Sequence, residues 1–191
     1  MPIVLGARPP EHGASTRTRP TAGARRHRGE ASKARSIEVG LVNNMPDAAL
    51  EATERQFVDI LGAAADARPV RLHLFSLPQL PRGEAARSYL GLGYAPIDKL
   101  DEAGLDALIV TGTEPRARLL DREPYWDTLS KVVDWAEHNT ISTIWSCLAA
   151  HAAVLHLAGI RRSPLSEKCF GLFEHRRDRT TGCFKAYPRQ F

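Results

Sequence analysis

The sequence predicts an α/β protein with a parallel sheet that is covered by helices on both faces. Short runs of β-branched and apolar residues alternate with segments in which apolar residues recur at helical spacing. Turn-forming residues separate these runs over short distances, as in the stretch NNMPD that begins at Asn43. Strands and helices that alternate with short connections imply right-handed crossovers, and therefore parallel strands in one sheet.

Four runs are expected to be strands, and three segments are expected to be helices. The strands are predicted at residues 37–42, 70–77, 105–112 and 142–145, because these runs are rich in β-branched and apolar side chains. The helices are predicted at residues 48–65, 125–139 and from 148 onward. The expected inward faces of the first two helices are Leu50, Phe57, Ile60 and Leu61, and Leu129, Val132, Val133 and Ala136. Residues 77–100 are expected to form a long loop with one short helix.

The composition fits one globular domain. Of the 191 residues, 43% are apolar and 25% are charged, which is enough for one ordinary core. The sequence has no run of eighteen apolar residues and no secretory signal, so it predicts a cytoplasmic protein without a membrane span. Cys147, Cys169 and Cys183 lack C-x-x-C spacing and are expected to be free thiols.

Residues 1–36 are basic and are predicted to form a disordered tail. They hold eight Arg or Lys residues and two acidic ones, whereas the whole chain has a net charge of +4, so the remainder is slightly acidic. The segment contains Pro, Gly, Ser and Thr without apolar periodicity. We therefore expect residues 37–191 to form the α/β domain, with neither nucleic acid nor a membrane among its partners.

Cys147 is the strongest candidate for a functional residue, because it falls where a predicted strand meets a predicted helix. In open α/β sheets, ligands bind outside the carboxyl ends of the strands. A sharp turn there lifts the side chain into the crevice, and the first turn of the helix favours the thiolate form. The same turn offers backbone N–H groups to an oxyanion, that of Leu148 first. The alternative reading is a buried cysteine of the core.

The chain resembles the homoserine O-acyltransferases, which comprise O-succinyltransferases and O-acetyltransferases, in the order and spacing of four segments. These segments are VGLVNNMPDAALEATERQF, LDALIVTGTEP, YWDTLSKVVDWAEHNTISTIWSCLAAHAAVLHLAGI and SEKCFGLFEH. The resemblance runs from about Ile37 to about His175. It implies a flavodoxin-like three-layer parallel sheet, similar to that of class I glutamine amidotransferases. It also implies transfer of a succinyl or acetyl group from coenzyme A to the hydroxyl of L-homoserine, in methionine biosynthesis.

The resemblance assigns roles to individual residues. Cys147 becomes the nucleophile that carries the acyl group as a thioester, Lys168 contacts substrate, and the backbone at Gly112 and Thr113 helps Leu148 to bind the oxyanion. Acyl-coenzyme A is then a co-substrate and no cofactor is bound permanently. The expected partners are small molecules and, in a homodimer, a second copy of the chain. No metal site is expected, because the histidines lack ligand spacing.

The sequence departs from the family pattern at three places. The family's general base, a histidine held by a glutamate in a later segment, has no counterpart before the sequence ends at Phe191, so a truncated fragment or a pseudoenzyme is one alternative. His151, His156 and His175 are weak substitutes for that base. Glu114 and Arg116 occupy positions near the acyl group and leave the acyl preference open. Asp47 and Ala48 stand where the family has a lysine, which leaves the acceptor open.

A glutamine-amidotransferase-like or DJ-1-like cysteine hydrolase is the other alternative, because it would place a cysteine on the same kind of turn. Such enzymes usually have a glycine two residues before and two residues after the cysteine. This sequence has Trp145 and Ala149 at those positions, which disfavours a hydrolase.

Overall fold

The computed structural model describes residues 3–5, 35–65, 68–163, 165–167 and 171–174. The chain divides into two compact units, residues 1–161 and residues 162–191. All helices and strands of the described residues lie in the first unit. Among the described residues, no helix is both long and apolar enough to cross a membrane.

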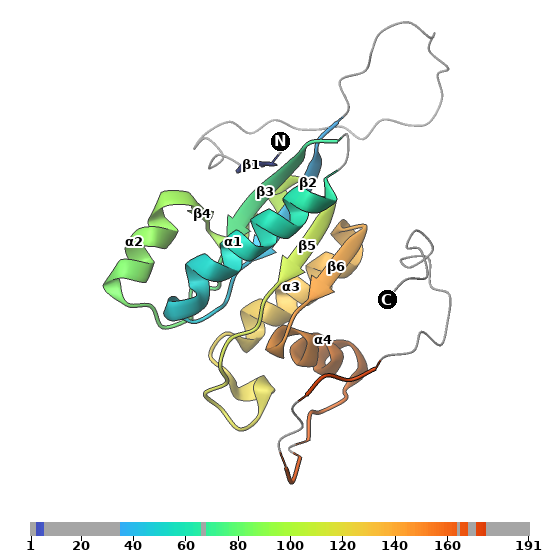
Figure 1. Ribbon diagram of the computed structural model, residues 1–191. Helices are drawn as coiled ribbons and strands as arrows, with labels where there is room; N and C mark the ends of the chain where they lie inside the picture. Colours follow the sequence, from blue (N-terminus) through green and yellow to red (C-terminus); the bar gives the residue numbers. More distant parts are fainter. Residues whose placement is uncertain (1–2, 6–34, 66–67, 164, 168–170, 175–191) are drawn as a thin grey trace, which may run out of the picture. The chain divides into compact units, whose positions relative to one another are not determined.

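The first unit is built on a parallel sheet with the strand order β1-β3-β2-β5-β6 (Figure 1). These strands are β1 (Ile3–Leu5), β2 (Ile37–Val42), β3 (Val70–Phe75), β5 (Ala107–Val110) and β6 (Ser142–Trp145), and the two-residue β4 (Tyr94–Ala95) pairs with the end of β3. The register is continuous across the middle of the sheet, where Val42 lies opposite Phe75 on one side and Val110 on the other. From β2 onward the order is that of a flavodoxin-like sheet, which confirms the predicted fold class.

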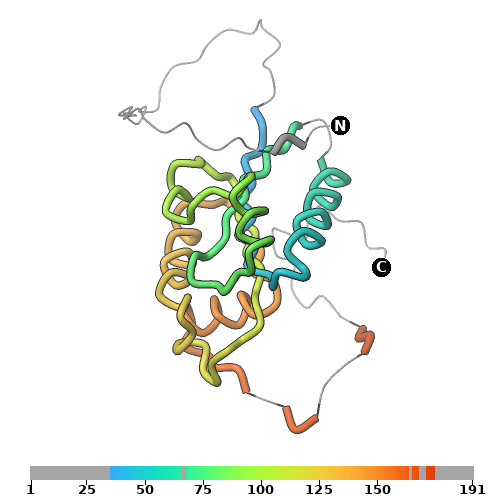
Figure 2. Tube along the Cα trace, turned by 90° about the vertical axis from the view of Figure 1, so that its left-hand side faces the viewer, coloured from blue at the N-terminus to red at the C-terminus, as the bar shows by residue number. Residues whose placement is uncertain are grey.

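Helices cover the two faces of this sheet, as Figure 2 shows edge-on. Helix α1 (Asp47–Ala64) lies on one face, and α3 (Trp126–Asn139) and α4 (Leu148–Ala158) lie on the other. Helix α2 (Glu84–Gly93) and the short 3₁₀ helices η1 (Ile97–Ala103) and η2 (Leu120–Arg122) complete the connections. Helix α4 ends at Gly159, whose φ of 68° is a conformation that glycine adopts without a steric penalty.

The core consists of two apolar layers, one on each face of the sheet. Val42, Leu108 and Val110 are fully buried in the layer against α3 and α4, and Leu41 and Leu72 are fully buried in the layer against α1. Each such side chain stabilises the fold by about 1.5–3 kcal/mol through the hydrophobic effect. Successive side chains of β2 point to opposite faces of the sheet, so Leu41 packs in the layer against α1 and Val42 packs in the layer against α3 and α4.

The predicted strands and helices are present in the structure, and three predictions need correction. Residues 77–100 contain α2, β4 and the start of η1, and so are more regular than the predicted loop. Ile60, which was placed on the inward face of its helix, is 52% exposed. Ile3–Leu5 form a strand beside β3, so the predicted disorder does not extend to these three residues, and residues 6–34 lie outside the described part of the chain.

Candidate active site

The candidate site lies at the carboxyl ends of β2, β5 and β6. The chain leaves β2 toward α1 on one face and leaves β5 toward α3 on the other, so the sheet has its topological switch point between these two strands. Crevices at switch points are the usual ligand sites of open α/β sheets. Asn43 and Asn44 follow β2 there, Thr111 and Gly112 follow β5, and Cys147 follows β6.

Cys147 occupies the turn between β6 and α4, which confirms its predicted placement. Its φ of 56° and ψ of −126° make it the one non-glycine residue with a positive φ among the described residues. Such a conformation costs an ordinary side chain about 1–3 kcal/mol, and it recurs at functional sites. Its side chain is exposed and its thiol is free. The core alternative for Cys147 is therefore wrong.

The backbone amides of Gly112, Thr113 and Leu148 lie beside this turn and have no acceptor in the described part of the chain. In the first turn of α4, the amides of Ala149 and Ala150 already donate, to Ser146 O at 3.2 Å and to Cys147 O at 3.1 Å. The Leu148 amide is thus the open donor of that turn, and the partial positive charge of a helix N-terminus adds to it.

Gly112 packs directly against the start of α4. A Cβ atom at this position would lie 2.5 Å from the Leu148 nitrogen and 2.9 Å from its Cα. Only glycine permits this approach, which brings the loop after β5 to the turn at Cys147. Gly112, Thr113, Leu148 and Ala149 border one narrow crevice between β5 and α4.

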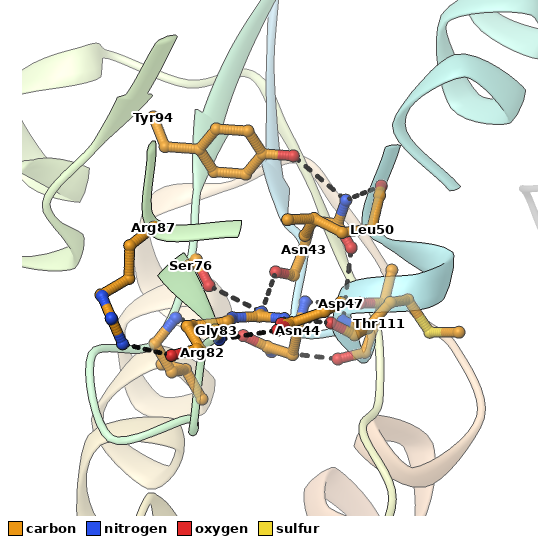
Figure 3. A network of polar contacts seen from close by, with 12 residues as sticks. Asn43, Asn44, Asp47, Leu50, Ser76, Arg82, Gly83, Arg87, Tyr94 and Thr111 are labelled. Carbon is orange, nitrogen blue, oxygen red and sulfur yellow. Dashed lines mark hydrogen bonds and ion pairs between the residues drawn. The ribbon is translucent and has the colours of Figure 1, made fainter. Parts of the chain in front are cut away.

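Two buried asparagines tie the loops of this edge together (Figure 3). The Asn44 backbone amide donates to Thr111 Oγ1 at 2.8 Å, its side-chain amide donates to Thr111 O at 3.0 Å, and its Oδ1 accepts from the Leu77 amide at 3.2 Å. Asn43 donates to Leu50 O at 2.9 Å. These residues were predicted only as part of a turn, because their partners lie far away in the sequence.

Arg82 joins the loop after β2 to the loop after β3, and no local sequence pattern predicted this role. Its side chain is only 6% exposed and forms an ion pair with Asp47 at 3.1 Å. It also donates to the Met45 carbonyl, to Asn43 O at 3.4 Å and to Ser76 Oγ at 3.2 Å, and Figure 3 shows it between these loops.

Asp47 is part of the same cluster. The hydrogen bond from the Gly83 amide, at 2.7 Å, is the main cause that holds the pKa of Asp47 below its usual value; burial opposes it, and Arg82 lowers the pKa further. Arg82 therefore places a buried guanidinium beside the Asp47 carboxylate.

A pocket of about 390 Å³ opens next to these loops. Its wall includes Asp47, Arg82, Thr113, Glu114 and Arg116, and Thr113 also borders the narrow crevice beside Leu148. Glu114 and Arg116 are exposed and form no ion pair within the described chain, so both side chains are open to a ligand. The structure thus places the two residues predicted for acyl specificity at one pocket, next to the predicted oxyanion donors.

The other predicted residues do not join this group. Lys168 and His175 lie outside the described residues, as do Cys169 and Cys183. His151 is exposed one turn along α4. His156, predicted as a weak substitute for the base, has its Nε2 2.7 Å from Asp134 Oδ1. Across the described ranges, no three His, Cys, Asp or Glu residues form a group that could hold a metal ion.

Comparisons with a family model and with known proteins identify the same family. Residues 10–191 match the model of the family described as homoserine O-succinyltransferase. The chain is 61% identical over 140 residues to a homoserine O-succinyltransferase of Rhodopseudomonas palustris, a match that covers 73% of this chain and 42% of that protein. It is 52% identical over 139 residues to a protein of the same name from Bradyrhizobium japonicum, with 72% and 43% covered. The chain thus spans about two-fifths of the length of these relatives.

Proposed function

Because the chain belongs to the homoserine O-succinyltransferase family, we propose that it takes an acyl group from an acyl-coenzyme A onto Cys147 and delivers it to L-homoserine. This step belongs to methionine biosynthesis, and we place it in the cytoplasm. The observation that carries the proposal is the exposed thiol of Cys147, held on a positive-φ turn beside the Gly112, Thr113 and Leu148 amides, which have no acceptor among the described residues.

The first half-reaction uses only groups at this edge of the sheet. The Cys147 thiolate attacks the thioester carbonyl, and the carbonyl oxygen becomes an oxyanion that accepts hydrogen bonds from the Leu148 and Thr113 amides, with Gly112 beside them. The carbon–sulfur bond to coenzyme A then breaks and coenzyme A leaves as its thiolate. One thioester replaces another, so this step needs no large input of free energy. Removing one such oxyanion donor typically costs about 10²–10³ in rate.

The second half-reaction transfers the acyl group to the homoserine hydroxyl. The hydroxyl oxygen attacks the acyl carbon, its proton passes to a general base, and Cys147 leaves as the thiolate. No histidine in the described ranges hydrogen-bonds to Cys147, so the base is not assigned to one of them.

We further propose that the acyl group is succinyl and that Arg116 recognises its terminal carboxylate. Arg116 lies on the pocket wall that shares Thr113 with the oxyanion crevice, and its guanidinium has no ion-pair partner in the described chain. A guanidinium pairs well with a carboxylate in bidentate geometry. The acetyl group has no carboxylate and would gain nothing from this contact. Glu114, on the same wall, works against succinyl unless it points away from the bound group.

The test is rapid mixing of the chain with succinyl-coenzyme A. We expect a burst of free coenzyme A equal to the amount of protein and an intact-mass increase that maps to Cys147, and C147A should show neither. A chain that releases no coenzyme A, or that is acylated elsewhere, would refute the acyl-enzyme. A chain that hydrolyses glutamine but takes no acyl group from acyl-coenzyme A would be a hydrolase of the amidotransferase type.

The acyl preference is tested separately. Arg116→Gln should lower the acylation rate with succinyl-coenzyme A by about 10- to 100-fold, the range expected for losing a charge-assisted hydrogen bond, and should leave the rate with acetyl-coenzyme A unchanged. Arg118→Gln is the matched control, because Arg118 is exposed two residues further along but does not line the pocket. Equal rates for both variants with succinyl-coenzyme A would exclude this role for Arg116.

A further inference from the structure

Residues 112–118, the loop after β5, are almost without hydrogen bonds of their own. In the described structure they make two, from the Arg116 amide and the Ala117 amide, both 2.7 Å long and both to Oε1 of Glu123. This loop carries Thr113, Glu114 and Arg116, which line the pocket. A single carboxylate oxygen therefore accounts for all the hydrogen bonds that hold this wall of the pocket.

Glu123 is a charged residue at a buried position. It is 4% exposed, and no cation pairs with it within the described chain. Its second oxygen, Oε2, is buried and has no hydrogen-bond partner among the described residues. Burial of a carboxylate with two amides as its only partners is a poor arrangement for stability, because desolvation opposes most of the gain.

The side chain of Glu123 is also not needed for the turn that carries it. The backbone of this residue is held on both sides, because its amide donates to Leu120 O at 3.1 Å and its carbonyl accepts from the Trp126 amide at 2.9 Å. The local structure between η2 and α3 therefore forms through backbone bonds, and the carboxylate acts only on the loop.

From this geometry we infer that Glu123 is a positioning residue, which fixes the loop 112–118 so that its amides and its Arg116 side chain meet the acyl group. The inference rests on the proposed function, since the loop is assigned to the acyl group there. Glu123 itself lines neither the pocket nor the crevice, so it acts through the loop.

Two substitutions of similar size separate hydrogen bonding from packing. Glu123→Gln keeps an oxygen that can accept from both amides, whereas Glu123→Met fills the same space without an acceptor. We expect E123Q to be acylated at the wild-type rate and E123M to lose about 10- to 100-fold, as a displacement of about 1 Å can cost that much. Alkylation of Cys147 by iodoacetamide, which needs no loop, should be equal in all three proteins.

Two further readouts distinguish this role from a merely structural one. The preference for succinyl- over acetyl-coenzyme A should fall in E123M only, and the Arg116 and Ala117 amides should lose protection against hydrogen exchange in E123M only. If E123M does not fold, Glu123→Asp, which keeps the charge but is one methylene shorter, replaces it with the same expectations.

These experiments distinguish a failure of the inference about Glu123 from a failure of the proposed acylation of Cys147. If E123M is acylated at the wild-type rate with unchanged preference, or if E123Q loses as much as E123M, the inference is overturned. If the wild-type chain is not acylated at Cys147, the proposed function fails, and the hydrogen-exchange comparison still reports on the role of Glu123 in the loop.

Discussion

Replacement of Gly112 by alanine should disturb the site more than any other change of one methyl group. The added Cβ would lie 2.5 Å from the Leu148 nitrogen, 2.8 Å from its Cβ and 2.9 Å from its Cα, whereas ordinary contacts of this kind are 3.4–4 Å long. Two of these three atoms belong to the backbone, so no side-chain rotation relieves the clash. The loop and the first turn of α4 must separate by about 1 Å.

Overpacking of this kind costs about 1–3 kcal/mol. In a domain of this size each kcal/mol lowers Tm by about 2–4 °C, so G112A should melt several degrees below the wild type. The same shift moves the Gly112 and Leu148 amides relative to Cys147. On the proposed function, acylation by succinyl-coenzyme A should therefore slow by about 100-fold.

The measurement is thermal unfolding by circular dichroism together with the coenzyme A burst. Gly91→Ala is the matched control, because Gly91 lies within α2 and a Cβ there meets nothing within 4 Å. It should stabilise the protein slightly through helix propensity. If G112A and G91A melt at the same temperature, the close contact at Leu148 is not present in solution. A lower Tm with an unchanged burst would separate the contact from the chemistry.

Three further changes test the same edge of the sheet. Gly40→Ala should cost less than G112A, since the Cβ would meet only Leu side-chain tips, at 2.5 and 2.8 Å, which can rotate; comparable melting temperatures would contradict this. Asn44→Ala leaves the buried Thr111 carbonyl and Leu77 amide without the hydrogen bonds that Asn44 supplies, and should lower the unfolding free energy in urea by about 2–4 kcal/mol. The control, Asn139→Ala at an exposed position, should change the unfolding free energy by less than about 0.5 kcal/mol. The pKa of Asp47 is lowered mainly by the Gly83 amide, so the carboxylate's contribution to stability is complete above its ordinary pKa of 3.8 and is lost as pH falls through the folded value. The difference in stability between wild type and D47N should therefore shrink below pH 3.8, and a difference independent of pH would contradict the lowered pKa.

Local sequence patterns were sufficient for β2, β3, β5 and β6 and for the turn at Cys147, but not for β1 and β4. The run from Ile37 to Val42 is apolar and β-branched, and it became β2 with the predicted bounds. The predicted inward face of α3 is buried at all four positions. Cys147 was found because a strand signal and a helix signal meet there, and both depend on neighbouring residues only.

The rest of the site depends on contacts that a linear pattern does not contain. Asn44 meets Thr111 across 67 positions of sequence, and Arg82 meets Asp47 across 35. These residue types are common in exposed loops, so the burial of Asn44, Thr111 and the Arg82 side chain could not be predicted from type alone. Helix α2 was underestimated for a similar reason. It contains Gly91 and Gly93, which lower helix propensity, and it is held by long-range contacts such as the hydrogen bond from Tyr89 to Glu54 at 2.9 Å.

At position 147, the stability of the fold and the proposed chemistry favour different residues. A φ of 56° suits glycine, so Cys147→Gly should relieve about 1 kcal/mol or more of strain. In a library of variants sorted only for the amount of folded protein in the cell, glycine would therefore be enriched at position 147. In the same library sorted for acyl transfer, only cysteine would survive there. A position where glycine is enriched for folding but cysteine is required for acyl transfer is one where the catalytic side chain lowers the stability of the fold. Such a scan would locate this turn without any structure.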